Sequence, residues 1–355
     1  MRINHLLLEN YRNYSNLKLD LHPAGAIIFG KNGSGKTNLL EAIAYSAFGR
    51  SFQTIHDDDL IHFQRDFFRI NSEFYLNDKN LNIDSAYSRN NKKIKINQHQ
   101  IKRLSELFKY IKVVYFSPQD IDFSAGSPGF RRYFFDLAIS QFSYQYMEIL
   151  KQYSRVLKQR NALLKHNFSR EEKLTWDESY IKLGTQIIKK RKEYLQKFDP
   201  KLTEYHNFIS NNNEVLTSEY LISFPMEKGK NIESCFEECL RKNEKKEIEN
   251  QRSMYGPHLD DYYFRLNGRS FRKFGSQGQK RSLVISARLV QANLIFESAG
   301  DYPILMFDDI LADLDTGRTS RILQLLKTDH QIFIATPNLN HYEIAGFPKI
   351  DLEQL

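Results

Sequence analysis

The sequence is poor in cysteine and has no long apolar run. Its 355 residues contain two cysteines, Cys235 and Cys239, which excludes a disulfide framework. No apolar stretch approaches the ~20 residues that a membrane-spanning helix requires. Residues 1–5 lack the apolar stretch of a signal peptide, so we expect a cytoplasmic protein.

The two cysteines stand four positions apart in a charged segment, residues 233–252, that we expect to be helical. Two chains could pool four thiolates around zinc. However, a C-x-x-x-C spacing on a helix differs from a tight zinc knuckle. Reduced structural thiols are therefore the favoured interpretation, and a zinc site is the alternative.

The overall composition permits two globular domains and suggests an anionic partner. Hydrophobic residues make up 41% of the chain, enough for a sizeable core. The formal net charge is +8 and the sequence pI is about 9.1. This charge favours a polyanion such as nucleic acid, although many basic proteins bind none.

The strongest motif is a phosphate-binding loop at residues 30–37, which fits G-x-x-x-x-G-K-S/T at every fixed position. A predicted buried strand precedes it at residues 26–29, and helical spacing follows at residues 38–43. Lys36 is expected to reach the β- and γ-phosphates of a nucleotide, and the Thr37 hydroxyl is expected to ligate Mg²⁺. The predicted nucleotide contacts are Gly30, Lys31, Asn32, Gly33, Ser34, Gly35, Lys36, Thr37 and Asn38.

A second motif, Ser276-Gln277-Gly278-Gln279, opens an apolar helix at residues 282–296. Ser276 is expected to cap this helix, whose free N–H groups offer an anion site. The string is similar to the S-G-G-Q signature of ABC-type ATPases. Capping alone would explain the serine, but not the whole string.

A third motif consists of a buried strand, residues 303–307, that ends in two carboxylates. Asp308 is predicted to hold Mg²⁺, and Asp309 is predicted to orient or deprotonate the attacking water. Asp313 and Asp315 follow at the spacing of a D-loop. ABC-type ATPases usually carry Glu at the second position and a switch histidine after the next strand. Here the residues are Asp309 and Thr336-Pro337, so a non-hydrolysing ATP-binding scaffold stays an alternative.

Two isolated residues are weaker candidates for the same site. Gln119 follows a predicted core strand, residues 112–116, and is placed to ligate the metal. Arg12 lies at the turn between predicted strands at residues 2–10 and 17–21. It is a candidate nucleotide contact, and a solvated turn arginine is the equal alternative.

Basic residues cluster near the end of a predicted antiparallel meander, residues 67–97. The cluster is a DNA-phosphate patch on one interpretation and a solvated basic face on the other. Its members are Lys92, Lys93, Lys95, Lys102 and Arg103.

Residues 130–255 differ in character from the rest. Apolar spacing predicts a long helix over 146–164 and a second helix over 176–198. Pro200 is expected to end the second helix, with a third, shorter helix beginning near residue 201. We therefore predict an α/β fold with a discontinuous ATPase head, residues 1–125 and 254–355. Residues 126–253 form an inserted helical lobe.

The order of the three motifs, with about 240 residues between phosphate loop and signature, resembles the RecF family of bacterial DNA replication and repair proteins. The resemblance covers nearly the whole chain, including residues 9–14, 116–120, 126–132, 158–165 and 256–261. Paired aspartates such as Asp308 and Asp309 are the family pattern. Gln119 and Leu259 depart from it, replacing an acidic and a basic residue respectively.

The resemblance implies an ABC-type P-loop ATPase head with an antiparallel β-subdomain and a helical arm. It implies an ATP-dependent homodimer in which each signature meets the partner's γ-phosphate. It further implies weak, Mg²⁺-dependent ATP hydrolysis and clamping of DNA at single-strand/duplex junctions. The implied partners are the RecO and RecR mediators, with which the clamp loads a recombinase at gaps. A transporter ATPase subunit is a less favoured alternative.

Overall fold

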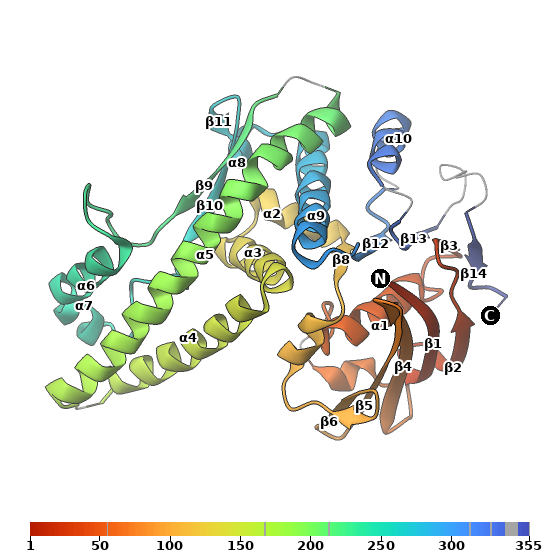
Figure 1. Cartoon of the computed structure of the whole chain (residues 1–355), viewed down its shortest axis with the longest axis horizontal. Coiled ribbons are helices and arrows are strands. Elements are labelled where there is room, and N and C mark those ends of the chain that lie inside the picture. The colour runs from red at the N-terminus through yellow and green to blue at the C-terminus, as the bar shows by residue number, and fades with distance from the viewer. Residues whose placement is uncertain are drawn as a thin grey trace. The chain divides into compact units, whose positions relative to one another are not determined.

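The structure is a computed structural model that describes residues 1–54, 56–166, 168–211, 214–311, 314–326, 329–337 and 347–354. The chain divides into two compact units (Figure 1). The head unit comprises Met1–Asp120 and Ala287–Leu355, and the helical unit comprises Ile121–Ser286. The helical unit therefore ends at Ser286 rather than at the predicted residue 253. Residues 254–286 belong to the helical unit.

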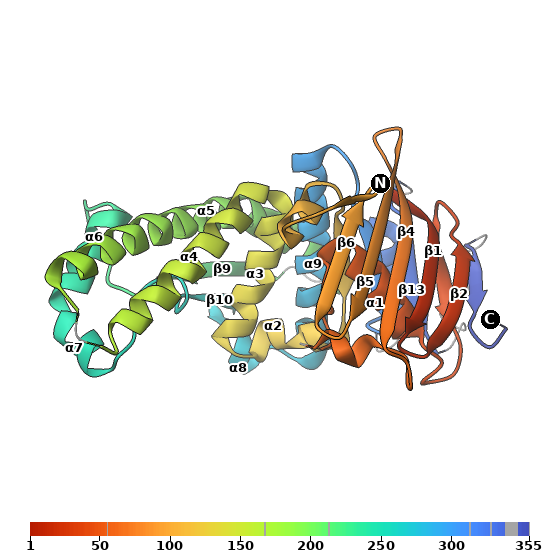
Figure 2. The ribbon, with the colours of Figure 1, turned by 90° about the horizontal axis from the view of Figure 1, so that it is seen from below.

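An antiparallel sheet forms one layer of the head unit, in the order β2-β1-β4-β5-β6-β7, and Figure 2 shows its strands β2, β1, β4, β5 and β6 side by side. Apolar and polar residues alternate along its strands, so one face is buried, as residues such as Leu8, Phe68 and Ile83 show. The predicted N-terminal hairpin and meander are confirmed. The strands are β1 (Arg2–Tyr11), β2 (Tyr14–Asp20), β4 (Phe67–Leu76), β5 (Lys79–Ser88), β6 (Asn91–Ile96) and β7 (His99–Gln100).

A parallel sheet forms a second layer, in the order β14-β3-β13-β12-β8. Its central strands β12 and β13 are buried throughout and apolar up to their last residues, Asp308 and Thr336, because both faces of the sheet are covered. The carboxyl ends of parallel strands share one edge, where ligands bind in such folds. The strands are β3 (Gly25–Phe29), β8 (Val113–Phe116), β12 (Ile304–Asp308), β13 (Ile332–Thr336) and β14 (Lys349–Asp351).

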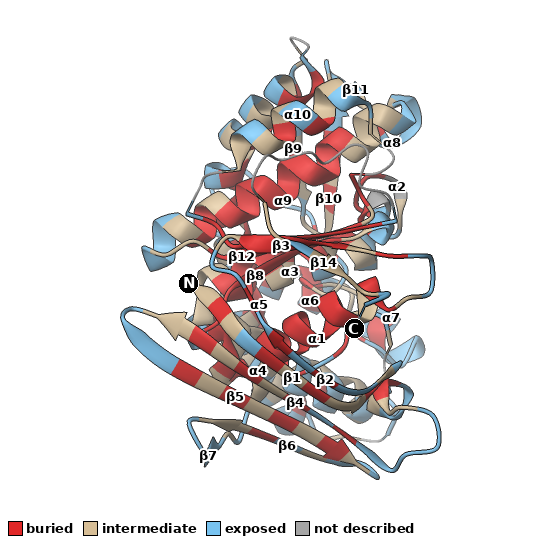
Figure 3. Ribbon diagram, turned by 90° about the vertical axis from the view of Figure 1, so that its right-hand side faces the viewer, coloured by how far each residue is buried: buried red, intermediate tan, exposed pale blue. Residues whose placement is uncertain are grey.

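Helix α1 (Lys36–Phe48) contacts strands of both sheets and is buried almost all round (Figure 3). A helix enclosed in this way needs apolar or small residues on every side, which residues 39–48 supply apart from Glu41. This packing fixes the helix that follows the phosphate loop. The unit also contains η1 (Asp57–Leu60), η2 (Leu104–Lys109) and α10 (Thr316–Leu325), and η3 (Pro118–Ile121) ends at its boundary.

The helical unit combines a set of helices with a small sheet ordered β11-β10-β9. Helices α4 and α5 pack against each other, and α5 also packs on β9 and α6. The helices are α2 (Asp122–Ala125), α3 (Pro128–Phe142), α4 (Tyr144–Leu163), α5 (Arg170–Ser210), α6 (Ile232–Lys242), α7 (Glu244–Glu249) and α8 (Phe271–Phe274). The strands are β9 (Leu216–Leu221), β10 (Asp261–Leu266) and β11 (Arg269–Ser270), and α9 (Gln277–Ala299) begins in this unit.

The prediction that Pro200 ends a helix is wrong, because α5 continues through it to Ser210. Proline removes one helical hydrogen bond and disfavours a helix interior. Tertiary contacts on both sides of the proline offset this cost. The Asp199 carboxylate accepts hydrogen bonds from the backbone N–H and hydroxyl of Ser218, and the Thr203 hydroxyl donates to Leu216 O at 2.5 Å.

A buried arginine organises the far end of α4. The side chain of Arg160 is fully buried and donates to Asp177 at 2.7 Å and to Glu247 at 2.6 Å. Its third hydrogen bond reaches the Ser253 hydroxyl at 2.7 Å. Removing one member would leave a buried charge uncompensated, which costs about 3–5 kcal/mol. The motif at residues 158–165 therefore contributes to the core of the unit.

A second buried arginine joins α3, α5 and the loop before β10. Arg191 donates to both carboxylate oxygens of Asp136 and, at 2.7 Å, to Pro257 O. Nearby, Arg131 makes a two-point ion pair with Asp261 at 2.8 and 2.9 Å. The motifs at residues 126–132 and 256–261 thus contact each other within this unit. Across the described residues, no helix combines the length and apolar character needed to span a bilayer.

Candidate nucleotide-binding site

The phosphate loop connects β3 to α1 at the carboxyl edge of the parallel sheet. Gly33 and Gly35 have φ angles of +83° and +106°, a region that favours glycine. A Cβ on Gly35 would also lie 2.4 Å from the Asn13 side chain. These left-handed glycines give the backbone before the N-terminus of α1 the conformation that an anion-binding loop requires.

Lys36 lies inside this loop, and its side chain is nearly fully buried. Its ammonium donates to Gly30 O at 2.8 Å and to Lys31 O at 2.9 Å. The two hydrogen bonds thus hold the Lys36 ammonium against the carbonyls at the start of the loop. Lys31 itself is exposed and lies near Glu353, with an ion-pair distance of 3.5 Å.

Thr37 and Asp308 meet where α1 and β12 adjoin. The Thr37 hydroxyl donates to Asp308 Oδ1 at 2.9 Å, and the Tyr115 hydroxyl donates to Asp308 Oδ2. Burial raises the pKa of Asp308, although its hydrogen bonds from Tyr115 and Thr37 act in the opposite direction. Tyr115 is in turn covered by the ring of Phe52. Tyr115 is not among the site residues predicted from the sequence. Its one sequence signal is a polar hydroxyl inside an otherwise apolar strand.

The turn between β1 and β2 rests on the phosphate loop. The Asn13 amide donates to Ser34 O at 3.1 Å, and the Tyr14 hydroxyl donates to Gly35 O at 3.1 Å. Asn38 donates to Asn13 Oδ1 at 2.8 Å, so the predicted nucleotide contact Asn38 supports this turn. Neither Asn13 nor Tyr14 was singled out from the sequence as a support of the loop.

Arg12 is held by Glu41, a fully buried carboxylate on α1. The guanidinium donates to Glu41 at 2.9 and 3.2 Å and to Asp59 O at 3.0 Å. The Ser51 hydroxyl also donates to Glu41. Arg12 is therefore a fixed residue beside the loop rather than a solvated turn arginine. The sequence signal for this ion pair is Glu41 itself, a charged residue in an otherwise apolar stretch of α1 that requires a buried partner.

Gln119 is exposed on η3, directly after β8. Its neighbour Asp120 is buried and accepts two hydrogen bonds from Arg288 of α9, at 2.6 and 3.1 Å. Asp120 also accepts from the Ser117 N–H at 3.0 Å. This ion pair fixes the short segment that carries Gln119, at the carboxyl edge of the parallel sheet.

Asp309 follows Asp308 at the end of β12 and has a φ angle of +53°. Asp and Asn are among the few residues besides glycine that adopt this left-handed conformation routinely. The Asp309 N–H donates to Ala335 O at 3.1 Å, which fixes the backbone against β13. The Asp308 carboxylate thus accepts from Thr37, and Asp309 is fixed by its backbone at the end of the strand.

The signature segment lies in the helical unit, where Ser276 caps α9 as predicted. The Gln279 N–H donates to Ser276 Oγ at 3.2 Å, and the Ser276 N–H donates to Gln279 Oε1 at 2.8 Å. The Gln279 amide also donates to Glu214 at 2.7 Å. Ser276 and Gln277 are exposed, and Gly278 is partly exposed.

The remaining predicted residues follow β12 in the chain. Asp315 caps α10 by accepting from the Arg318 N–H at 2.9 Å. Asp313 lies outside the described residues. Thr336 is buried at the carboxyl end of β13, next to Phe29 of β3 in the sheet register.

The predicted basic patch divides between the two faces of β6. Lys92 points to the buried face, donates to Gly49 O at 2.8 Å and pairs with Asp57. Lys93 lies on the opposite face and is exposed, whereas Lys95 is partly exposed opposite Asp84. Lys102 and Arg103 are exposed before η2. Lys92 therefore has a structural role that the others do not share.

The cysteines lie on one face of α6 and are both buried. Burial raises the pKa of Cys239. Among the described residues, no group of three or more His, Cys, Asp or Glu side chains is arranged to hold a metal ion. Both thiols are buried against the rest of the helical unit, which is a position typical of structural cysteines.

The model of the RecF/RecN/SMC N terminal domain matches residues 2–348. The DNA replication and repair protein RecF of Staphylococcus aureus (strain USA300) is 34% identical over 360 residues, which cover 99% of this chain and 97% of that protein. The chain belongs to the RecF family. RecF of S. aureus (strain JH9) is also 34% identical over the same shares.

Solved structures agree with this family assignment. One of them is the structure of the recombination mediator protein RecF with ATP in the RecFOR pathway. It aligns with a TM-score of 0.89 and 30% identity, over 96% of this chain and 93% of that one. An Smc head bound to the C-winged helix domain of ScpA aligns with a TM-score of 0.55 and 16% identity, over 95% and 89% of the chains. The second likeness extends to the fold alone. The α/β ABC-type ATPase fold is confirmed.

Proposed function

We propose that this RecF-family protein is an ATP-gated DNA clamp of recombinational repair and replication in the cytoplasm. The observation that carries the proposal is the contact of Thr37 with Asp308 beside a formed phosphate loop. ATP is the proposed ligand, cradled by loop N–H groups and by Lys36. The DNA-repair assignment rests on the relatives' names.

The residues present fit a magnesium ion. Two neighbouring ligands of an octahedral Mg²⁺ at 2.0–2.1 Å are about 2.9 Å apart. Thr37 Oγ1 and Asp308 Oδ1 are 2.9 Å apart. We propose that these two residues hold the metal, with Gln119 as a further ligand. When bound, Mg²⁺ would offset charge on the β- and γ-phosphates of ATP.

We propose Asp309 as the residue that positions or deprotonates the attacking water, and Lys36 as the cation that stabilises the transferred phosphoryl group. Tyr115 would hold the Asp308 carboxylate in place through the hydrogen bond described above. Arg12 is a proposed nucleotide contact that Glu41 orients.

In the proposed dimer, Ser276, Gln277 and Gly278 would meet ATP bound to the partner, with Asp313 and Asp315 near the seam. The capped α9 N-terminus offers N–H groups suited to a γ-phosphate. The dimer would grip single-strand/duplex junctions, act with RecO and RecR, and open after hydrolysis.

Sedimentation of the protein with ATP, with ADP and without nucleotide tests this proposal. We expect a dimer only with ATP. In Ser276→Arg, bulk and charge at the seam should block dimerisation while each chain still binds ATP. An ATP-bound Ser276→Arg dimer would exclude the proposed seam, and a wild-type monomer in all three states would exclude the clamp.

A non-hydrolysing scaffold is the second candidate, favoured by the short carboxylate and left-handed backbone of Asp309. Steady-state hydrolysis with and without junction DNA separates the two. A rate no higher than that of Lys36→Ala under both conditions would support the scaffold.

A further inference from the structure

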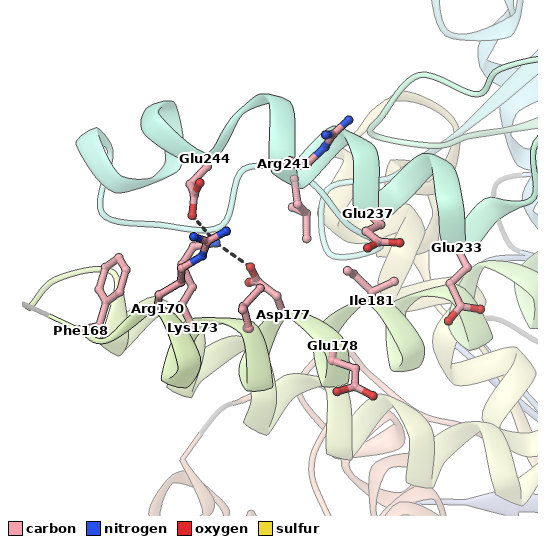
Figure 4. A pocket seen from close by; sticks show the side chains of 12 residues that line it. Phe168, Arg170, Lys173, Asp177, Glu178, Ile181, Glu233, Glu237, Arg241 and Glu244 are labelled. Atoms are coloured by element: carbon pink, nitrogen blue, oxygen red, sulfur yellow. Dashed lines mark hydrogen bonds and ion pairs between the residues drawn. The ribbon is translucent and has the colours of Figure 1, made fainter.

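The helical unit contains a groove between α5 and α6 that the nucleotide site does not use (Figure 4). Its volume is about 630 Å³. Leu174, Ile181 and Leu240 provide apolar surface along it. Leu174, on the second turn of α5, is 56% exposed, whereas Ile181 and Leu240 are buried and border the groove with little exposed area.

The groove is elongated and follows both helices. On α5 the lining residues run from Arg170 to Ile181 at spacings of three and four, a length of about 17 Å. On α6 they run from Glu233 to Arg241 at the same spacings. The groove thus follows about three turns of α5, with Leu174 and the glutamates exposed along it, a length that matches a third, amphipathic helix.

Charge is separated along the groove. Figure 4 shows Glu178, Glu233 and Glu237 around the Ile181 end, whereas Lys173 pairs with Asp177 and Glu244 at the other end. Within the described part of the chain, none of those three glutamates has an ion-pair partner. By contrast, Glu238 on the same α6 is paired with both Lys230 and Lys242.

The sign of this charge differs from that of the whole chain. The lining contains five carboxylates and three basic side chains, on a protein of net charge +8. Such a surface repels DNA and attracts cationic groups. Unpaired exposed carboxylates beside apolar surface are complementary to a helix with leucine-type anchors and flanking lysine or arginine.

We propose that the α5–α6 groove binds an amphipathic, basic helix of a partner protein. The anchors would contact Leu174, Ile181 and Leu240, and the basic flank would face Glu178, Glu233 and Glu237. This interaction is independent of the nucleotide site and does not rest on the proposed clamp function.

The test uses the full-length protein and a fluorescein-labelled, 18-residue helical peptide of leucine and lysine as the probe. Anisotropy gives the Kd for wild type and for the groove variant Glu178→Lys/Glu233→Lys/Glu237→Lys. The matched control, Glu193→Lys/Glu204→Lys/Glu219→Lys, makes the same net charge change at exposed positions of the helical unit outside the groove. Circular dichroism confirms that both variants are folded.

We expect the groove variant to bind at least about tenfold more weakly than wild type and the control to lose less than about threefold. Leu174→Asp should also weaken binding, because it removes an anchor without adding positive charge. A benzophenone placed on the apolar side of the peptide should crosslink to α5 and α6 around Leu174 and Leu240.

Several results would overturn the proposal. These are no binding at about 1 mM peptide, equal losses in the groove and control variants, or crosslinks confined to other elements. Crosslinking of a photoreactive duplex DNA to α5 and α6 around Leu174 and Leu240 would assign the groove to nucleic acid and overturn the proposal. Nucleotide-independent self-association that the groove variant abolishes would assign it to a second copy of this chain.

Discussion

Lys36 combines burial with two hydrogen bonds to loop carbonyls, so its ammonium is held against the start of the phosphate loop. Lys36→Ala removes the charge-assisted contacts to a bound nucleotide. We expect ATP to bind about 100-fold more weakly, measured with a fluorescent ATP analogue. Lys36→Arg should keep part of the binding but hydrolyse poorly, because a planar fork fits the loop differently. Unchanged affinity in Lys36→Ala would contradict the assignment of the loop.

Asp309→Asn should separate binding from hydrolysis. Asparagine tolerates the φ of +53° as well as aspartate does, so the backbone should be preserved while the charge is lost. We expect Mg·ATP affinity within about twofold of wild type and hydrolysis slower by about 100- to 10,000-fold. Single-turnover hydrolysis, run beside sedimentation on DNA, should find an accumulated ATP-bound dimer. Near-normal hydrolysis would move the catalytic base to another residue.

Among single residues of the candidate site, the sequence predicts those that belong to contiguous motifs. Gly30 to Thr37 and Asp308 are recognisable because each motif fixes its own strand–loop geometry. Tyr115, Glu41 and Arg288 were missed, since each acts on a residue far away in the chain. Tyr115 meets Asp308 because β8 lies beside β12 in the parallel sheet, and Glu41 meets Arg12 because α1 packs near the β1–β2 turn. Local spacing encodes neither arrangement.

The loop between α7 and β10 provides a pH-dependent element. His258 accepts from the Tyr153 hydroxyl at 2.9 Å through Nδ1. Burial lowers the pKa of His258 to about 4, and the charges of Arg132, Arg160 and Arg191 act in the same direction. The unfolded chain therefore binds more protons between pH 6.5 and 4, so the free energy of unfolding falls as pH falls through this window.

We expect this histidine to reduce the free energy of unfolding of the helical unit by roughly 2 kcal/mol between pH 7 and pH 5. Urea titrations followed by fluorescence of Trp176, the one tryptophan of the chain, report on α5 of this unit. His258→Gln should flatten the pH dependence by that amount. An identical pH dependence in both proteins would show that His258 does not carry the effect.

Elements were predictable where their pattern was local. The hairpin β1–β2, the meander β4–β6 and helix α4 follow directly from apolar alternation or helical spacing. The sequence predicts two helices separated at Pro200, because proline disfavours a helix interior. The structure has one helix, α5, because tertiary contacts stabilise it on both sides of Pro200. These are the contacts of Asp199 and Thr203 with β9.

For the molecule as a whole, DNA affinity should depend on phosphate contacts and thus on salt. The triple variant Lys93→Glu/Lys95→Glu/Lys102→Glu should reduce the slope of log K against log salt by up to about 3. Lys92→Gln is the structural control, because Lys92 pairs with Asp57 inside the sheet layer. It should lower thermal stability and leave the salt slope unchanged. The same slope in the triple variant and wild type would remove these lysines from the interface.

The division into compact units was the least predictable global property. Strand and turn patterns resume in the sequence near residue 254, and the predicted boundary of the ATPase head lies there. However, β10 (residues 261–266) pairs with β9, which lies within the helical unit. This pairing places β10 in the helical unit as well. A pairing partner some 45 residues away determines which unit this strand joins, and composition does not reveal it.

The two buried cysteines have a practical consequence for labelling. Thiol reagents attack the exposed thiolate, and burial both shields Cys235 and Cys239 and, for Cys239, raises the pKa. Maleimides should therefore react slowly with the native protein. A cysteine introduced at an exposed position such as Glu204 should label selectively with no prior mutation of the natural thiols. Pairs of such sites, one in each unit, would allow fluorescence energy transfer to follow domain motion through the ATP cycle.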